Sequence, residues 1–93
     1  MKKYRKKPIV IEAKLFEMGM EDGYALYEPS SGTLVGFSPK NLQTLAFVVR
    51  KPAIKTLEGW YEVKVGEHYI ITGVEGERYP VEKNIFHKTY EEV

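Results

Sequence analysis

The stretch Val65–Glu92, with the sequence VGEHYIITGVEGERYPVEKNIFHKTYEE, decides the fold that this chain is expected to adopt. Its β-type runs flank Glu75-Gly76, and glycine accepts the positive φ that a tight hairpin turn requires. We expect a hairpin here, followed by a cap or Asx turn at Asn84 and one turn of 3₁₀ helix. Residues 87–93 then form a final strand or a frayed tail. The expected core residues of this stretch are Ile70, Ile71, Ile85 and Phe86.

The segment before it, AIKTLEGWYEVKV (53–65), shows the same pattern. Its turn pair Glu58-Gly59 recurs as Glu75-Gly76, seventeen residues later. The pair Gly66-Glu67 between the two segments is a third turn signal. We therefore expect a meander of two successive hairpins of similar geometry.

The N-terminal half also has strand patterns. PIVIEAKLF (8–16) alternates with a period of two, which predicts a strand with Pro8 at its start. YALY (24–27) and TLVGF (33–37) flank the turn cluster EPSSG (28–32), so a hairpin is expected there too. Residues 18–22 are expected to form a loop or a single helical turn.

One helix and one interrupted strand are expected between these hairpins. In SPKNLQTL (38–45), Ser38 has the position of an N-cap and Pro39 that of the first helical residue. In AFVVRKPAIKTL (46–57), Pro52 predicts a break, a bulge or an edge, because proline donates no ladder hydrogen bond.

Together these signals predict six to eight short strands and one or two short helices. The expected fold class is mainly β (α+β), a small curved antiparallel sheet or partly open barrel. The 93 residues are expected to form a single domain, 1–93. With 43% hydrophobic residues the core is thin for its surface, so we also expect a homo-oligomer.

Composition excludes several classes of protein. The chain has no cysteine, so it has neither disulfides nor thiolate chemistry. No apolar run approaches the roughly 20 residues that span a bilayer. Glu12 and Lys14 interrupt the apolar run after the basic N-terminus, which argues against a signal peptide. We expect no membrane association and a cytoplasmic location.

The charge is unevenly distributed. Residues 1–7 carry five basic groups and no acid, which leaves 9 basic against 13 acidic groups, a net charge of −4, in residues 8–93. This basic leader has two interpretations: an arm that contacts nucleic acid, or a solubilising flank that protects an edge strand from aggregation. The nucleic-acid candidates are Lys2, Lys3, Arg5, Lys6 and Lys7.

No catalytic or metal-binding pattern stands out. His68 and His87 are nineteen residues apart and form no metal-ligand motif, and the serines occupy predicted turns and a predicted cap. The glycines precede no helix with a phosphate-binding lysine. We expect no catalytic residues, no metal, no cofactor and no enzymatic activity.

Aromatic residues next to cations are the remaining chemical signal. Base stacking combined with basic groups suits single-stranded nucleic acid or isolated nucleotides. Because the body is acidic, a short ligand is favoured over a long polyanion. Trp60 and Tyr79 are equally compatible with core packing and with ligand stacking. For Tyr61 and Tyr69, core packing is the favoured role. The ligand-binding candidates are Trp60, Arg78, Tyr79, Lys83 and Lys55.

The opening KYRKKPIVIEA (3–13) and the closing stretch quoted above resemble small accessory proteins of tailed phages and prophages. Their pattern is K-Y-R-K-K-P-V-V-I-E-A at the start, and G-D-x-I-I-x-G-x-x-G-E-x-Y-P followed by x-I-F-x-x-T-Y-E at the end. Two positions depart from it: Glu67 replaces the usual aspartate, and Val81 replaces a frequent cysteine. The matching positions near the C-terminus are Gly66, Ile70, Ile71, Gly73, Gly76, Glu77, Tyr79, Pro80, Ile85, Phe86, Thr89, Tyr90 and Glu91.

This resemblance implies a phage protein in the cytoplasm of an infected bacterium, and it carries over no activity. By analogy with the way of life of such proteins, we expect a non-enzymatic binding protein that acts against host defence. A sharper form of this expectation is that it sequesters a nucleotide-derived immune signal. The alternatives are a nucleic-acid-associated or host-protein-inhibiting module that uses the basic arm, or a minor virion or assembly protein.

Overall fold

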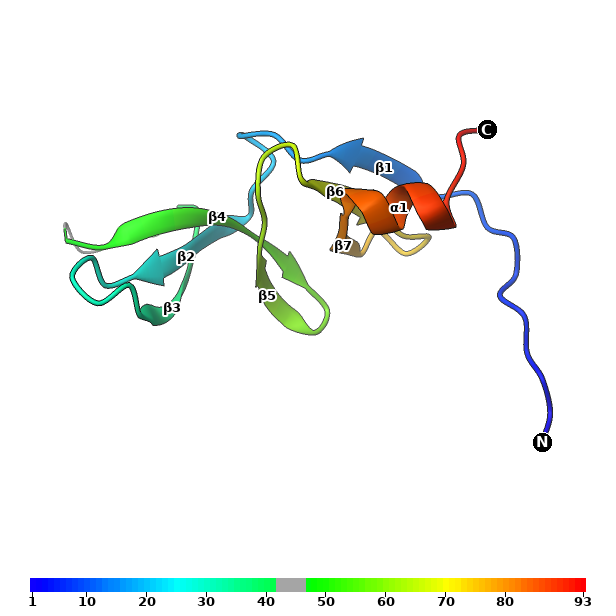
Figure 1. Cartoon of the computed structure of the whole chain (residues 1–93), viewed down its shortest axis with the longest axis horizontal. Coiled ribbons are helices and arrows are strands. Elements are labelled where there is room, and N and C mark those ends of the chain that lie inside the picture. The colour runs from blue at the N-terminus through cyan, green and yellow to red at the C-terminus, as the bar shows by residue number, and fades with distance from the viewer. Residues whose placement is uncertain (42–46) are drawn as a thin grey trace.

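The structure is a computed structural model that describes residues 1–41 and 47–93. The described residues form seven strands and one helix (Figure 1). In chain order these elements are β1 (Glu12–Leu15), β2 (Gly23–Tyr27), β3 (Leu34–Pro39), β4 (Val49–Thr56), β5 (Gly59–Glu62), β6 (His68–Thr72), β7 (Arg78–Glu82) and α1 (Lys83–Thr89).

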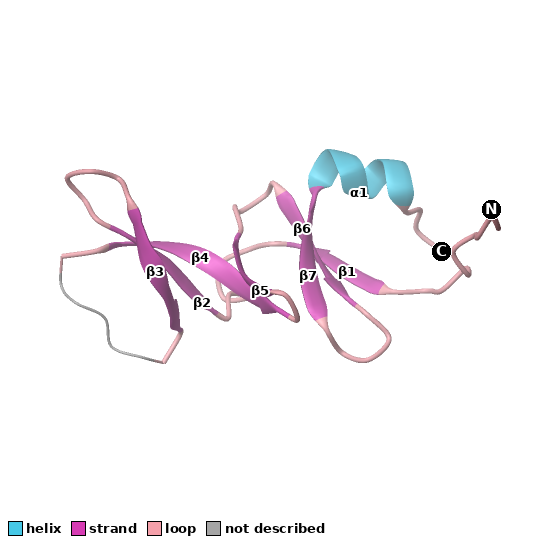
Figure 2. Cartoon of the chain, turned by 90° about the horizontal axis from the view of Figure 1, so that it is seen from below, coloured by secondary structure: helices cyan, strands magenta, loops and turns pink. Residues whose placement is uncertain are grey.

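The strands form two antiparallel sheets. Sheet A has the order β1-β6-β7, and sheet B, which curls into a half-barrel, has the order β3-β2-β4-β5. Figure 2 shows the two sheets following one another along the molecule, with α1 next to sheet A. The predicted class, a mainly β protein with a small curved sheet, is confirmed.

The predicted hairpin turns are present. The chain reverses between β4 and β5 with Gly59 at a φ of +122°, and between β6 and β7 with Gly76 at +82°. In the second turn the amide of Gly76 donates to the carbonyl of Gly73 (3.0 Å), as in a three-residue loop that ends in a glycine bulge. The expected meander is wrong, however, because the two hairpins belong to different sheets and β6 pairs with β1 rather than with β5.

The main core lies between the sheets. Phe16, Ile54, Val63 and Ile70 are all at most 3% exposed and pack together, with Met20 against them. Ile71 is fully buried and points to the other face of β6, the face on which the Phe86 ring of α1 stacks on Tyr69 at 4.0 Å. The predicted core positions 70 and 71 are therefore confirmed, and β6 is covered on both faces.

Sheet B uses small residues to bring rings close to its backbone. Gly23, Ala25 and Ala53 are buried, and the Trp60 ring lies over Gly23. A Cβ at position 23 would stand only 2.7 Å from Cη2 of Trp60. The Trp60 ring therefore lies across the sheet.

Two N-terminal predictions are corrected. The strand predicted for residues 8–16 covers only Glu12–Leu15, because β6 ends at Thr72, opposite Glu12, and offers no partner beyond it. Ser38 and Pro39 do not begin a helix, since they are the last residues of β3 and pair with β2. The rest of that predicted helix, residues 42–45, lies outside the described residues.

Pro52 does not interrupt its strand. Its carbonyl accepts the amide of Val63 (2.9 Å), so the backbone groups of residue 52 face the β5 side and the absent N–H removes no bond to β2. At the C-terminus, Ile85 is 54% exposed and is not a core residue. The predicted 3₁₀ turn is instead the longer helix α1, which includes His87. The Phe86 ring of this helix stacks on Tyr69, which favours a helix of two full turns.

Candidate functional site

A pocket of about 490 Å³ lies between the β4–β5 hairpin and the β6–β7 hairpin, and we call it the interhairpin pocket. Its volume is within the range typical of small-molecule sites. Sheet B supplies Pro39, Lys55 and Trp60, which share one face of that sheet, and β7 supplies Arg78. The pocket is thus built where the two sheets meet.

The aromatic wall of the interhairpin pocket is Trp60. Its ring is nearly parallel to that of Phe37, with 6.1 Å between centroids and 6° between planes. Lys55, its direct partner across β4 and β5, holds its Nζ 5.9 Å from the centroid of the Trp60 ring. Among the residues that the structure describes, Lys55 forms no ion pair, so its ammonium is available to a ligand.

Arg78, by contrast, is engaged within the protein. Its guanidinium donates to Oδ1 of Asp22 (2.7 Å) and to the carbonyl of Met20 (2.9 Å). The other oxygen of Asp22 accepts the backbone amide of Lys55 (2.9 Å). Asp22 therefore joins both hairpins and balances the charge of Arg78, which leaves Lys55 as the main cation for an incoming anion.

Glu77 also lines the pocket but has a role in the turn. Its carboxylate accepts the amide of Glu75 (3.0 Å) and fills the space beside Gly73, where a Cβ would clash with it. This hydrogen bond directs the acid toward the turn. The walls of the pocket therefore have mixed charge and are not a purely basic phosphate site.

Tyr79 and Lys83 lie outside the interhairpin pocket. Tyr79 lines an adjoining pocket of about 440 Å³, which also contacts Leu57 and Arg78. Burial first, and then the Tyr90 hydroxyl and the charge of Glu77, raise the pKa of Tyr79 above its ordinary value of 10.0. Lys83 is exposed at the start of α1 and lines neither pocket. The structure thus brings together Lys55, Trp60 and Arg78, three of the five predicted residues.

The basic arm is separate from this site. Residues 1–7 are all exposed, and Figure 1 shows the N-terminal segment running away from sheet A. This places the five basic candidates, Lys2, Lys3, Arg5, Lys6 and Lys7, on an extended segment without regular secondary structure.

One face of sheet B carries Phe37, Trp60 and Tyr27, and we call it the ring-bearing face. Sequence reasoning missed several residues of this face. The hydroxyl of Tyr27 donates to the Glu62 carboxylate, which raises the pKa of Tyr27, with further contributions from burial and the charge of Glu62. Nζ of Lys51 lies 4.7 Å from the centroid of the same ring. The alternation within β2 and β4 would have placed Tyr27 and Lys51 on the face that carries Lys55.

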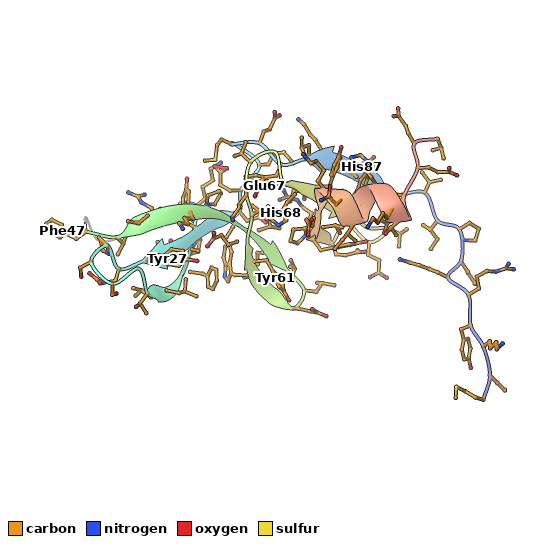
Figure 3. The ribbon with its side chains drawn as sticks, viewed as in Figure 1. Tyr27, Phe47, Tyr61, Glu67, His68 and His87 are labelled. Carbon is orange, nitrogen blue, oxygen red and sulfur yellow. The ribbon has the colours of Figure 1, made fainter. Side chains whose placement is uncertain are left out.

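The histidines have local partners. Nδ1 of His68 accepts the amide of Lys64 (3.0 Å), and Nε2 of His87 lies 3.5 Å from the Tyr69 hydroxyl. Figure 3 shows His68 in the middle of the molecule and His87 on the helix. Within the described ranges, no three His, Cys, Asp or Glu side chains gather as a metal site would require.

No protein-family model, curated protein or solved structure matches this chain. Among the described residues, no helix has the length and apolar character needed to cross a membrane. The functional argument therefore rests on the interhairpin pocket itself: an aromatic wall, one available ammonium and two carboxylates.

Proposed function

We propose that this protein is a non-enzymatic binding protein whose interhairpin pocket holds a small planar ligand with an anionic group, of the nucleotide type. The observation that carries this proposal is the common location of Trp60 and Lys55, which two strands direct into one pocket. An indole ring stacks on any base, and a neighbouring ammonium attracts phosphate.

The charges narrow the class of ligand. Because Asp22 balances Arg78, a ligand with several phosphates would meet one further cation, Lys55, and one further acid, Glu77. This balance favours a mononucleotide or a cyclic nucleotide over a polyphosphate. Donor groups on the ligand would find acceptors in the carboxylates of Asp22 and Glu77.

A biological role follows from the resemblance to phage accessory proteins. In an infected bacterium, a protein that binds a nucleotide-derived immune signal without converting it would lower the free concentration of that signal. We propose this sequestration as the way in which the protein acts against host defence.

Titration calorimetry against a panel of cyclic and ADP-ribose-type nucleotides tests the binding step. We expect heat from at least one member, and at least about a fivefold loss of affinity in Trp60→Leu, since base stacking contributes about 1–3 kcal/mol. No heat from any member of the panel with folded protein would overturn the proposal.

The matched control for the cation is another lysine of β4. Lys51 and Lys55 both lie on the ring-bearing face and both stand over an aromatic ring, but only Lys55 lines the interhairpin pocket. Lys55→Gln should weaken binding, whereas Lys51→Gln should leave it unchanged. Equal effects of the two substitutions would place the ligand elsewhere.

The basic arm supports a second candidate, binding to nucleic acid, because its five basic side chains are all exposed. Deletion of residues 2–7 separates the two candidates. Loss of binding to a single-stranded oligonucleotide, together with a steep dependence on salt, favours the arm. Nucleotide binding that is unchanged by this deletion favours the pocket.

A further inference from the structure

Strand β1 is an edge strand with a free side. It pairs with β6 on one side only, and no described strand pairs with the other. All four of its residues, Glu12 to Leu15, are exposed. An exposed edge of this kind is a ready template for pairing with another chain.

The backbone groups that face this free side can be identified. The amide of Phe16 donates to the carbonyl of His68 on β6 (2.7 Å), so residues 12, 14 and 16 direct their N–H and C=O groups toward β6. Ile11, Ala13 and Leu15 therefore direct theirs outward. These outward groups are available to a further antiparallel strand.

The charges of β1 fit a second copy of the same strand. In an antiparallel pair related by a two-fold axis, hydrogen-bonding parity requires one residue to face its own copy. An axis at Glu12 or at Lys14 would oppose like charges. An axis at Ala13 sets Glu12 opposite Lys14 of the second copy on both sides, and it sets Ile11 opposite Leu15 of the second copy.

We propose that two copies of this chain pair antiparallel through β1, about a two-fold axis at Ala13, to form a continuous six-stranded sheet of the order β7-β6-β1-β1-β6-β7. The outward groups of Ile11, Ala13 and Leu15 form the hydrogen-bonded pairs. Glu12 and Lys14 form the non-hydrogen-bonded pairs, in which the side chains of opposite strands are closest.

The segment before β1 fits the same arrangement. Residues 9–11 are β-branched, and the sequence predicts a strand there, yet within the described chain β6 ends too early to pair with them. Ile9 is 52% and Val10 is 75% exposed. In the proposed dimer, Val10 comes opposite Phe16 of the second copy, so the strand extends as its sequence predicts. This inference is independent of the ligand proposed for the interhairpin pocket.

Charge exchange tests both the dimer and its register. Glu12→Lys alone places lysine opposite lysine, and Lys14→Glu alone places glutamate opposite glutamate. Each variant should dimerise at least about tenfold more weakly than the unaltered protein in sedimentation equilibrium. An equimolar mixture of the two should form a heterodimer, because both cross-strand pairs are then of opposite charge. Glu92→Lys is the control for a change of net charge outside β1.

Two further measurements keep the test decisive if a variant folds poorly. The Ala13 and Leu15 amides of the unaltered protein should exchange hydrogen more slowly as concentration rises, while exposed amides of the arm should not. Ala13→Pro, which removes one outward donor, should weaken the dimer. An unaltered protein that is monomeric at about 1 mM, or a mixture that fails to recombine although each variant is folded, overturns the proposal.

Discussion

In sheet A the strand β6 is covered on both faces, by the shared core on one side and by α1 on the other. Sheet B, by contrast, carries Phe37, Trp60 and Tyr27 on a face that no described helix covers. The two sheets reach burial by different routes. In sheet A large side chains interlock, with Ile70 and Ile71 at most 3% exposed. In sheet B small residues let flat rings lie on the backbone. One sheet is therefore sensitive to lost volume, and the other to added volume.

The largest expected effect on stability comes from removing volume from the core that both sheets share. Ile54 is fully buried between them. Ile54→Ala should lower the free energy of unfolding by about 3 kcal/mol, measured by urea denaturation, because it leaves a cavity. Ile54→Val is the graded control, with a loss of about 1 kcal/mol. A loss below that of the valine variant would contradict this account of the core.

Adding volume to sheet B should have the next largest effect. A Cβ at position 23 would overlap the carbonyl oxygen of Ser38 and stand 2.7 Å from the Trp60 ring. Gly23→Ala should therefore destabilise the protein by about 2 kcal/mol and change the near-ultraviolet dichroism of Trp60. Gly36→Ala in the neighbouring strand is the control, since nothing lies within 4 Å of its Cβ position. Equal effects of the two variants would refute the close approach.

A smaller effect concerns the buried carboxylate at the start of sheet B. Burial raises the pKa of Glu21, but hydrogen bonds from its own amide and from Gly19, together with Lys40, outweigh this and lower the pKa below 4.5. The resulting stability is present above pH 4.5 and is lost as the pH falls through the folded pKa. Glu21→Gln should cost about 1 kcal/mol at pH 7 and flatten this acid dependence.

The control for Glu21 is Glu17→Gln. Glu17 pairs with Lys14 at 2.9 Å, but its side chain is 61% exposed, so the change should have little effect on stability. Urea denaturation at pH 7 and at pH 3 measures both variants. An acid dependence that survives in Glu21→Gln would assign it to another group.

The smallest expected effect on stability lies in the turn between β2 and β3. There the pKa of Glu28 is shifted far enough for NMR titration to detect it clearly. Hydrogen bonds from the hydroxyls and amides of Ser30 and Ser31 lower the pKa of Glu28 from 4.5 to about 2. Any stability that this turn contributes is therefore present above pH 4.5 and is lost as the pH falls toward 2. Replacing both serines by alanine should return the pKa toward 4.5, whereas Ser38→Ala should not.

Much of the fold could be predicted because its signals are local. The positive φ of Gly59 and Gly76 is a demand of two short turns, and the apolar pair Ile70-Ile71 is visible within the strand-like run before the second turn. Ser38 and Pro39 were mispredicted because their cap-like pattern is equally local, while their strand pairing with Gly23 and Tyr24 is not. Pairing across 14 to 16 residues leaves no mark in a short window of sequence.

The candidate site likewise has features that follow from local sequence and features that depend on distant residues. Lys55 and Trp60 face each other because their hairpin fixes the register, and that register follows from the turn. The role of Arg78 depends on Asp22, 56 residues away, so no local pattern shows that its guanidinium is already engaged. Tyr79 was grouped with Arg78 by adjacency, although successive residues of a strand point to opposite faces.

The pairing of β1 with β6 has a consequence for the order in which the chain folds. Thr72 follows its partner Glu12 by 60 residues, so β1 has no partner until most of the chain exists. At about 5–20 residues per second, synthesis of that interval takes about 3–12 s. Non-local pairing is also the slow step of folding in general. In pulsed hydrogen exchange during refolding, the amides of the β4–β5 and β6–β7 hairpins should gain protection before those that join β1 to β6. We therefore expect β1, the first of the strands to be synthesised, to be the last to pair.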